Sequence, residues 1–266
     1  MNKLYHKPLI SIITAVFNGE KNLEKTIQSI IGQTYTNIEY IIIDGGSTDG
    51  TLDIIKKYKD KISYWISEKD QGIADAFNKG VKVAKGDYLN FQGDGDGFIC
   101  NNALEKIFYE VDSQKDILIS TRIQRVDIDG KKIFTSKYLK NFHKQSLLLK
   151  MSLPHQGLFT HDSFFSKYGL FDINYKFCMD YDHLLRAYKD FPRVVTKDII
   201  TANWRVDGIG NNKTLEIFKE YDRTKRKNKV LNNIILLFIN YWIIFKHSVI
   251  IFLKSLYVKS KNYLSR

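Results

Sequence analysis

The residues with the clearest chemical potential are two aspartates in a short glycine-rich segment, Gly93-Asp94-Gly95-Asp96-Gly97. Two carboxylates separated by one residue in a tight turn can supply oxygen ligands to a hard divalent cation, Mg2+ or Mn2+. The glycines beside them let a diphosphate approach the backbone closely. Asp96 is the candidate metal ligand, and Asp94 is a candidate for contact with the bound nucleotide. A solvated acidic turn without a metal is the alternative, and the position of this segment relative to the predicted strands decides between the two.

Side chains at the ends of the first two apolar, strand-like segments could line a nucleotide pocket. Asp44 could accept a hydrogen bond from a base N–H group or a ribose hydroxyl, or it could cap the helix that follows. Thr14, Ala15 and Phe17 close the first apolar run and would line the same pocket. Asp75 could orient a basic residue near the diphosphate, although a surface carboxylate is an equal alternative.

Two aspartates in the second half, Asp180 and Asp182, begin a helix-like segment. In a direct displacement at carbon, one carboxylate must remove the proton from the attacking hydroxyl. It must face the reacting carbon from the side opposite the leaving group, and a junction between loop and helix suits this task. Asp180 is the candidate base, with a helix N-cap as the alternative. Asp182 is a candidate for contact with the acceptor or the diphosphate, with a partner of the helix dipole as the alternative.

A histidine and an arginine complete the set of candidates. His155 lies in the segment Pro154-His155-Gln156-Gly157 and could touch the acceptor or the diphosphate, or it could be an ordinary loop histidine. Arg205 precedes Asp207-Gly208-Ile209-Gly210, a glycine pattern typical of a mobile flap, where its guanidinium could meet phosphate.

The elements that must position these side chains alternate regularly in the first hundred residues. The apolar patterns predict strands at Leu9–Phe17, Ile38–Ile43, Ile62–Ile66 and Tyr88–Phe91, and helices at Glu20–Gln33, Thr48–Tyr58 and Ile73–Ala84. Repeated strand-helix-strand units predict an α/β fold with a mainly parallel sheet and helices on both faces. Ligands bind such sheets beyond the carboxyl ends of the strands. Asp44 and the acidic turn both follow such ends, which favours a binding site.

The second half is less regular. Ile117–Phe134 is typical of strands that turn at Asp129-Gly130, and helices are expected at Asn141–Met151 and from Asp180 to Tyr188. Cys100 and Cys178 are the two cysteines and form no Cys-x-x-Cys motif, which indicates a reducing cytoplasm. No apolar signal region precedes the first strand, so we do not expect secretion.

The last part of the chain changes character. The net charge of the chain is +12. The segment from Lys213 onward contains twelve Lys or Arg and three acidic residues, so it carries +9 of this net charge. The apolar run Ile234–Phe245 is interrupted by Lys246-His247 and is shorter than the roughly 20 residues that cross a bilayer. We therefore expect a domain at 1–212 and an amphipathic helical tail at 213–266 that lies on a membrane as a helix or hairpin, not a nucleic-acid surface. A helix packed on the domain, a tight hairpin and a true span are the alternatives.

Several motifs together resemble the family 2 glycosyltransferases. The resemblance rests on Ile10–Asn18, Gln33-Thr34-Tyr35, Ile43–Thr51, Asp70–Ile73, Asn78-Lys79-Gly80 and Gly86-Asp87-Tyr88. Two later motifs, His155-Gln156-Gly157 and Asp180–Arg186, resemble a bacterial branch that serves O-antigen, capsule and related surface polysaccharides. The likeness covers roughly residues 8 to 210.

This resemblance implies a GT-A fold with a Rossmann-like sheet, inversion at the anomeric carbon, a nucleoside-diphosphate donor (often UDP) and a divalent metal. By position, Asp44 would contact the nucleobase, Asp96 would ligate the metal and Asp180 would be the base. Relatives usually carry an acid where this chain has Gly95. Asp94 would then supply the missing carboxylate from one residue earlier.

The sequence thus predicts a metal-dependent sugar transferase with a lipid-linked saccharide acceptor, held on the cytoplasmic face of the cell membrane by its tail. A nucleotidyltransferase would need a glycine-rich loop bearing Lys or Arg after the first strand, and Asn18-Gly19-Glu20-Lys21 is too poor for that. A non-catalytic scaffold of the same fold is the remaining alternative, and Gly95 is the feature that favours it.

Overall fold

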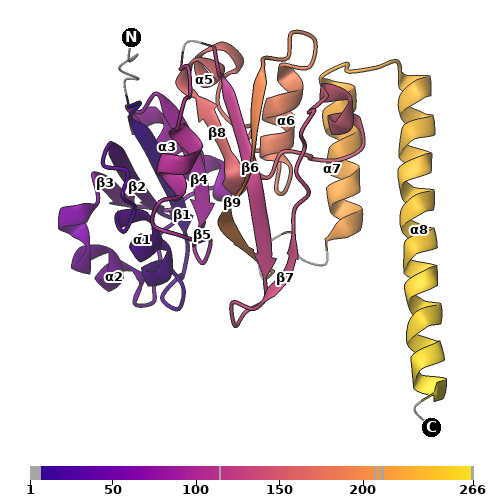
Figure 1. Cartoon of the computed structure of the whole chain (residues 1–266), viewed down its shortest axis with the longest axis horizontal. Helices are drawn as coiled ribbons and strands as arrows, with labels where there is room; N and C mark the ends of the chain where they lie inside the picture. Colours follow the sequence, from indigo (N-terminus) through magenta and orange to yellow (C-terminus); the bar gives the residue numbers. More distant parts are fainter. Residues whose placement is uncertain (1–6, 114, 207, 209, 211–212, 265–266) are drawn as a thin grey trace.

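The first half of the chain forms the parallel part of the sheet. The computed structural model describes residues 7–113, 115–206, 208, 210 and 213–264 (Figure 1). Four strands, β1 (Ile10–Val16), β2 (Ile38–Asp44), β3 (Tyr64–Ser67) and β4 (Tyr88–Gly93), alternate with α1 (Leu23–Ile31), α2 (Thr51–Lys57), a short 3-10 turn η1 (Lys59–Lys61) and α3 (Ile73–Val83). Strands β1–β4 pair in parallel in the order β3-β2-β1-β4, as the sequence predicts.

The second half extends the same sheet with antiparallel pairs. Its elements are β5 (Gly97–Phe98), α4 (Ala103–Phe108), β6 (Leu118–Val126), β7 (Lys132–Thr135), the 3-10 turns η2 (Lys144–Leu148) and η3 (His155–Gly157), β8 (Leu158–His161), α5 (Asp162–Tyr168), α6 (Met179–Arg186) and β9 (Val194–Arg205). The order continues β4-β8-β6-β9-β5, with β7 on β6. Strands β6 and β9 pair in parallel, and the other described pairs of this half are antiparallel. The complete sheet is therefore mixed.

Apolar side chains from both faces of the central strands build two cores. On β1, Ile13 and Ala15 join α3 and α6 on one face, whereas Ile10, Ile12 and Val16 join α1 and α4 on the other. Burial on both faces explains why the strand is a near-continuous apolar run.

The prediction of a helix over residues 141–151 is wrong. In place of a helix over Asn141–Met151, the structure has only the 3-10 turn η2. Leu147 and Leu148 are the buried residues of that turn, and two adjacent apolar anchors cannot form the repeating stripe that a longer amphipathic helix needs.

The C-terminal part forms two helices, α7 (Thr214–Lys227) and α8 (Asn233–Leu264). Helix α7 contacts α6, and Lys225, Val230 and Leu236 are buried, so this part packs on the domain. Helix α8 is one continuous helix of 32 residues that runs beside α7 and beyond it (Figure 1). None of the helices, within the residues described, is long and apolar enough to cross a membrane.

Candidate active site

The carboxyl ends of the parallel strands meet at one edge of the sheet. Val16 lies opposite Asp44, Asp44 lies opposite Ser67, and Ala15 lies opposite Gly93 in the strand register. The acidic turn that follows β4 therefore lies beside the ends of β1 and β2.

Asp44 is buried and its carboxylate is fixed from several sides. Oδ2 accepts hydrogen bonds from the N–H groups of Gly46 (3.1 Å) and Ser47 (3.0 Å) and from the hydroxyl of Ser67 (2.6 Å). Oδ1 accepts one bond, from the Ser47 hydroxyl, so this oxygen retains an acceptor position. The N-cap of α2 is Gly50, so Asp44 does not cap that helix.

The three residues expected at the end of β1 are exposed to different degrees. Thr14 is fully buried, and its hydroxyl lies 3.2 Å from the Tyr40 hydroxyl inside the protein. Ala15 is also buried. Phe17 is 61% exposed, so it is the one of the three whose side chain is free to meet a ligand.

Asp96 is buried in the turn between β4 and β5. Its Oδ2 accepts hydrogen bonds from Gln156 Nε2 (2.9 Å) and the Gly93 N–H (3.3 Å), and Oδ1 accepts one from the Arg205 N–H (3.2 Å). Burial raises the pKa of Asp96 to about 6. The Thr26 hydroxyl braces the turn because it donates to the Asp96 carbonyl at 2.6 Å and accepts from the backbone of the preceding residue.

Gly95 has a conformation and surroundings that disfavour a side chain. Its φ is +85°, and a Cβ there would lie 2.6 Å from Cδ of Arg205 and 3.3 Å from Cβ of Asn22. The Arg205 guanidinium donates to Oδ1 of Asn22, which holds the arginine across the turn. Arg205 therefore occupies the space that a side chain at position 95 would need. Asp94 faces the loop after β1, where its Oδ2 lies 3.0 Å from a Cβ built on Gly19.

His155 and Asp180 lie side by side. His155 Nδ1 is 3.6 Å from Asp180 Oδ2, and each side chain is 18% exposed. The His155 ring stacks on Phe91, with ring centroids 5.4 Å apart. Burial raises the pKa of Asp180 and lowers the pKa of His155. The N-cap of α6 is Cys178, so Asp180 lies in the first turn and is not the cap.

Gln156 is a residue of this site that the candidate set omits. It follows His155 in η3, and its carbonyl accepts hydrogen bonds from Asn90 Nδ2 (3.1 Å) and Gln92 Nε2 (3.0 Å) on β4. One short turn thus contacts both Asp96 and Asp180. The motif His155-Gln156-Gly157 was visible in the sequence, but nothing local indicated which carboxylate its glutamine would meet.

The structure does not bring Asp182 to this site. Its carboxylate is fully buried and accepts hydrogen bonds from Arg186 Nη2 (2.6 Å), Lys227 Nζ (3.1 Å) and Asn228 Nδ2 (3.0 Å). Donors from these three residues satisfy this carboxylate inside the protein, so contact with an acceptor or a diphosphate is not available to it.

Asp75 lies in the first turn of α3 and faces a basic side chain. Its Oδ2 accepts from the Gln71 N–H at 3.1 Å and lies 3.6 Å from Nζ of Lys79. Lys79 is therefore the basic residue that Asp75 could orient. Asp207 and Ile209, part of the expected flap, lie outside the described residues.

The acidic turn could bind a divalent metal whose remaining ligands come from the substrate. Among the residues described, no group of three or more His, Cys, Asp or Glu could enclose a metal ion. Mg2+ is usually held by one or two carboxylates, with phosphate and water as the other ligands. Asp96 Oδ1 accepts one hydrogen bond and keeps a lone pair, so Asp96 fits this pattern.

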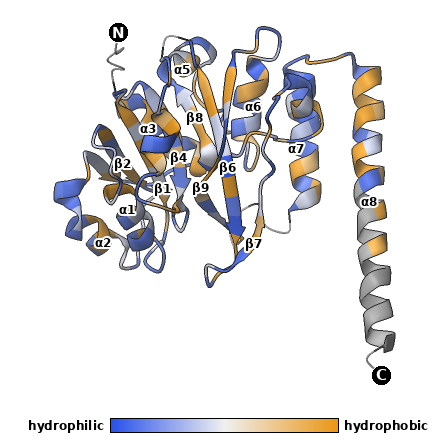
Figure 2. Cartoon of the chain, viewed as in Figure 1, coloured by the Kyte–Doolittle hydropathy of each residue, from blue (hydrophilic) through white to orange (hydrophobic). Residues whose placement is uncertain are grey.

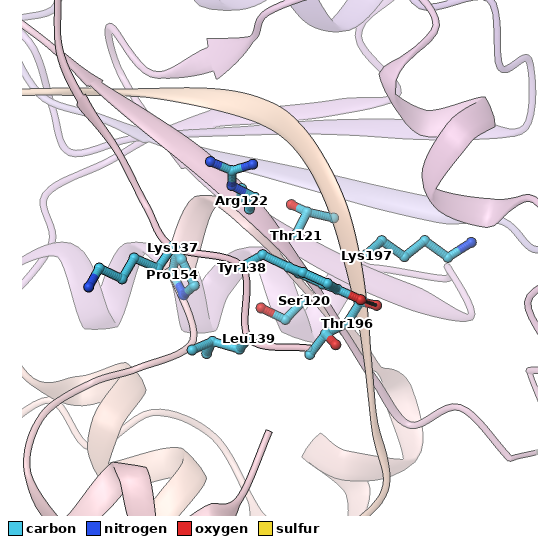
Figure 3. Close-up of a pocket in the computed structure, with 9 residues that line it drawn as sticks. All are labelled: Ser120, Thr121, Arg122, Lys137, Tyr138, Leu139, Pro154, Thr196 and Lys197. Carbon is cyan, nitrogen blue, oxygen red and sulfur yellow. Dashed lines mark hydrogen bonds between the residues drawn. The ribbon is translucent and has the colours of Figure 1, made fainter. Parts of the chain in front are cut away.

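A separate small pocket lies between β6, β9 and residues 137–139 (Figure 3). It has room for roughly one water molecule, so it cannot hold a nucleotide. Its polar lining includes Ser120, Thr121 and Thr196.

The sequence of this chain matches known proteins over most of its length. The model of glycosyl transferase family 2 matches residues 11–171. An uncharacterized glycosyltransferase of Rickettsia typhi is 29% identical over 84% of this chain and 72% of its own length. One of Rickettsia prowazekii is 32% identical over 71% and 61%, respectively. A PGL/p-HBAD biosynthesis glycosyltransferase of Mycobacterium tuberculosis is 28% identical over 76% and 78%.

Solved structures share the fold. Residues 1–349 of Staphylococcus aureus TarS, in complex with UDP, superpose with a TM-score of 0.67 and 18% identity, over 90% of this chain and 71% of that one. The mannosyltransferase PcManGT of Pyrobaculum calidifontis, in complex with GDP-Man and Mn2+, gives 0.62 and 15%, over 92% and 76%. The expected GT-A fold is therefore confirmed.

Proposed function

This chain belongs to glycosyl transferase family 2, and we propose that it transfers a sugar from a UDP-sugar to a lipid-linked saccharide with inversion at the anomeric carbon. The observation that carries the proposal is that the turn η3 lies beside two carboxylates, Asp96 after β4 and Asp180 in the first turn of α6. Gln156 bonds Asp96 at 2.9 Å, and His155 lies 3.6 Å from Asp180. An inverting transfer from such a donor needs positive charge to stabilise the leaving diphosphate, which a metal at Asp96 would supply, and a base on the acceptor side.

Asp180 is the proposed base. It takes the proton from an acceptor hydroxyl, whose oxygen forms a bond to the anomeric carbon while the bond from that carbon to the diphosphate breaks. Burial raises the pKa of Asp180, which makes its carboxylate a stronger base than an exposed aspartate. The adjacent imidazole of His155 keeps one side of the carboxylate away from water.

The donor would bind along the strand ends. Asp44 Oδ1, with its remaining acceptor position, would receive a nucleobase N–H, and Phe17 would cover the base. Lys79, which pairs with Glu68 at 2.9 Å and lies 3.6 Å from Asp75, and Arg205 would supply positive charge near the diphosphate.

Asp96 would hold Mg2+ or Mn2+, and Asp94 would contact the ribose of the donor. When bound, the metal neutralises the negative charge that develops on the departing diphosphate. The structure of PcManGT with GDP-Man and Mn2+ supports this choice of metal by analogy of fold.

Helix α8 is the proposed membrane contact, which would hold the enzyme at the cytoplasmic leaflet during synthesis of a surface polysaccharide such as O-antigen or capsule. Among the described side chains of the helix, Leu236, Ile239, Asn240 and Ile243 are less exposed. Figure 2 shows the described part of the helix as mostly apolar. Its exposed large apolar side chains are Ile234, Ile235, Leu237, Phe238, Tyr241, Trp242, Ile244, Phe245, Val249 and Leu253. An exposed apolar face together with a basic C-terminal segment favours an anionic lipid surface.

Replacement of Asp180 by Asn tests the central role. We expect transfer to be abolished and UDP binding to be retained, because the amide has the same shape and cannot accept the proton. Loss of UDP binding in this variant would refute the role of Asp180 as base. Tight binding of metal and nucleotide with no turnover of any donor by the wild type would favour a non-catalytic scaffold.

A further inference from the structure

We propose that Glu220 on α7 is a positioning residue for the base Asp180. This inference rests on the proposed function. Glu220 lies outside the segment that matches the family model, residues 11–171. Its carboxylate accepts hydrogen bonds from three consecutive backbone N–H groups, those of Lys176, Phe177 and Cys178, each at 2.9 Å.

These three N–H groups belong to the segment that leads into α6. The helix begins at Met179 with Cys178 as its N-cap, and Asp180 follows in the first turn. N–H groups at and before a helix start have no partner within the helix, so they need an outside acceptor. One carboxylate from another helix supplies all three bonds, and charge-assisted bonds of this kind are stronger than neutral ones.

Helix α7 also fixes the backbone after Asp180. Lys227 and Asn228, at the end of α7, bond the buried carboxylate of Asp182 at 3.1 and 3.0 Å. The rings of Tyr181 and Tyr221 pack with centroids 4.4 Å apart. Contacts from α7 therefore lie on both sides of Asp180 along the chain, which fixes the position from which its carboxylate faces His155.

The charge of Glu220 provides a signature that a purely structural role would lack. A nearby negative charge opposes ionisation of Asp180 and so adds to the rise in its pKa that burial causes. Replacement of Glu220 by Gln removes this charge and keeps the side-chain size. The pH at which kcat falls on the acid side should therefore become lower. It should also lower kcat, because the base is held less well.

The test compares Glu220→Gln with Glu216→Gln, in assays of the full-length chain. Glu216 is one turn earlier on α7, is exposed, and is 4.0 Å from Lys213, so it is a matched control. In Glu220→Gln we expect kcat to fall by about 10- to 100-fold, since small displacements of a catalytic group have effects of that order. We expect KM for the donor to change less than about twofold, because kcat and not binding is affected. Glu220→Asp should recover part of the loss.

Hydrogen exchange of the segment 176–182 gives a readout that does not need an identified donor. Glu220→Gln should lose protection there, with UDP binding unchanged, and Glu216→Gln should not. Unchanged protection, a wild-type kcat or an unshifted acid limb would overturn the role of Glu220. An active Asp180→Asn variant would instead refute the base itself, so failure of the proposed function is distinguishable.

Discussion

Gln156 donates a hydrogen bond from Nε2 to Oδ2 of Asp96 at 2.9 Å and so joins η3 to the acidic turn after β4. The preceding residue, His155, lies 3.6 Å from Asp180. Adjacent residues of one 3-10 turn thus contact the proposed metal ligand and the proposed base. This turn fixes the distance between the two carboxylates, and an inverting displacement depends on that distance.

Replacement of Gln156 by Ala should weaken metal binding. The glutamine orients the Asp96 carboxylate, and loss of an outer partner of a metal ligand typically costs about 10- to 100-fold in affinity. A titration with Mn2+ in the presence of UDP measures this. Gln124→Ala is the control, because Gln124 Nε2 makes a bond of the same 2.9 Å length to the neutral amide of Asn203. Equal Mn2+ affinity of the two variants would contradict the role of Gln156.

Gly95→Ala should destabilise the protein more than Gly130→Ala. Both glycines have positive φ, +85° and +83°, so both variants carry a similar backbone strain. A Cβ at position 95 meets Arg205, whereas a Cβ at 130 has open space. We expect the free energy of unfolding to differ by about 1–3 kcal/mol between the variants, the usual effect of overpacking.

Urea denaturation measures that difference. Addition of Arg205→Ala to Gly95→Ala should remove part of it, because the clash is with the arginine side chain. If Gly95→Ala and Gly130→Ala have equal stability, Arg205 does not occupy the space beside position 95.

As the pH is lowered, kcat should be lost at a higher pH than if the base were an exposed aspartate with an ordinary pKa. Asp180 must be ionised to accept a proton, and burial raises its pKa from the usual 3.8. Since the active form is the carboxylate, kcat is lost as the pH falls through this raised pKa. A profile of kcat at saturating donor and metal measures the limb. A limb at the pKa of an exposed carboxyl would contradict the assignment.

Phe238→Glu and Trp242→Glu should each reduce binding to lipid vesicles by tenfold or more. These side chains are 71% and 59% exposed on α8, so their replacement should leave folding intact. Burial of a large apolar side chain in the membrane surface contributes about 1.5–3 kcal/mol, and each tenfold change corresponds to about 1.4 kcal/mol.

Flotation with phosphatidylglycerol vesicles measures this binding. Ser248→Glu adds the same charge at another exposed position of α8 and is the control. Undiminished binding of the Phe238 and Trp242 variants would refute membrane contact through this face.

The strand ends were predictable because the parallel strands are buried on both faces. The apolar runs of β1, β2 and β4 end where Asp44 and the acidic turn begin, so the sequence alone brings these residues to one edge. Contacts between distant elements leave no such periodic signal. Glu220 meets residues 42 to 44 positions away, and Asp182 meets Lys227, 45 positions away. For that reason the role of Asp182 was misread and Glu220 was not singled out.

The most direct test of the central claim is release of nucleoside diphosphate from a panel of nucleotide-sugars, with and without Mn2+, by the wild type and by Asp96→Ala. We predict slow hydrolysis of one donor, a UDP-sugar, that is lost without the metal and lost in the variant. Absence of both hydrolysis and nucleotide binding in the wild type would contradict the assignment of the acidic turn as the donor site.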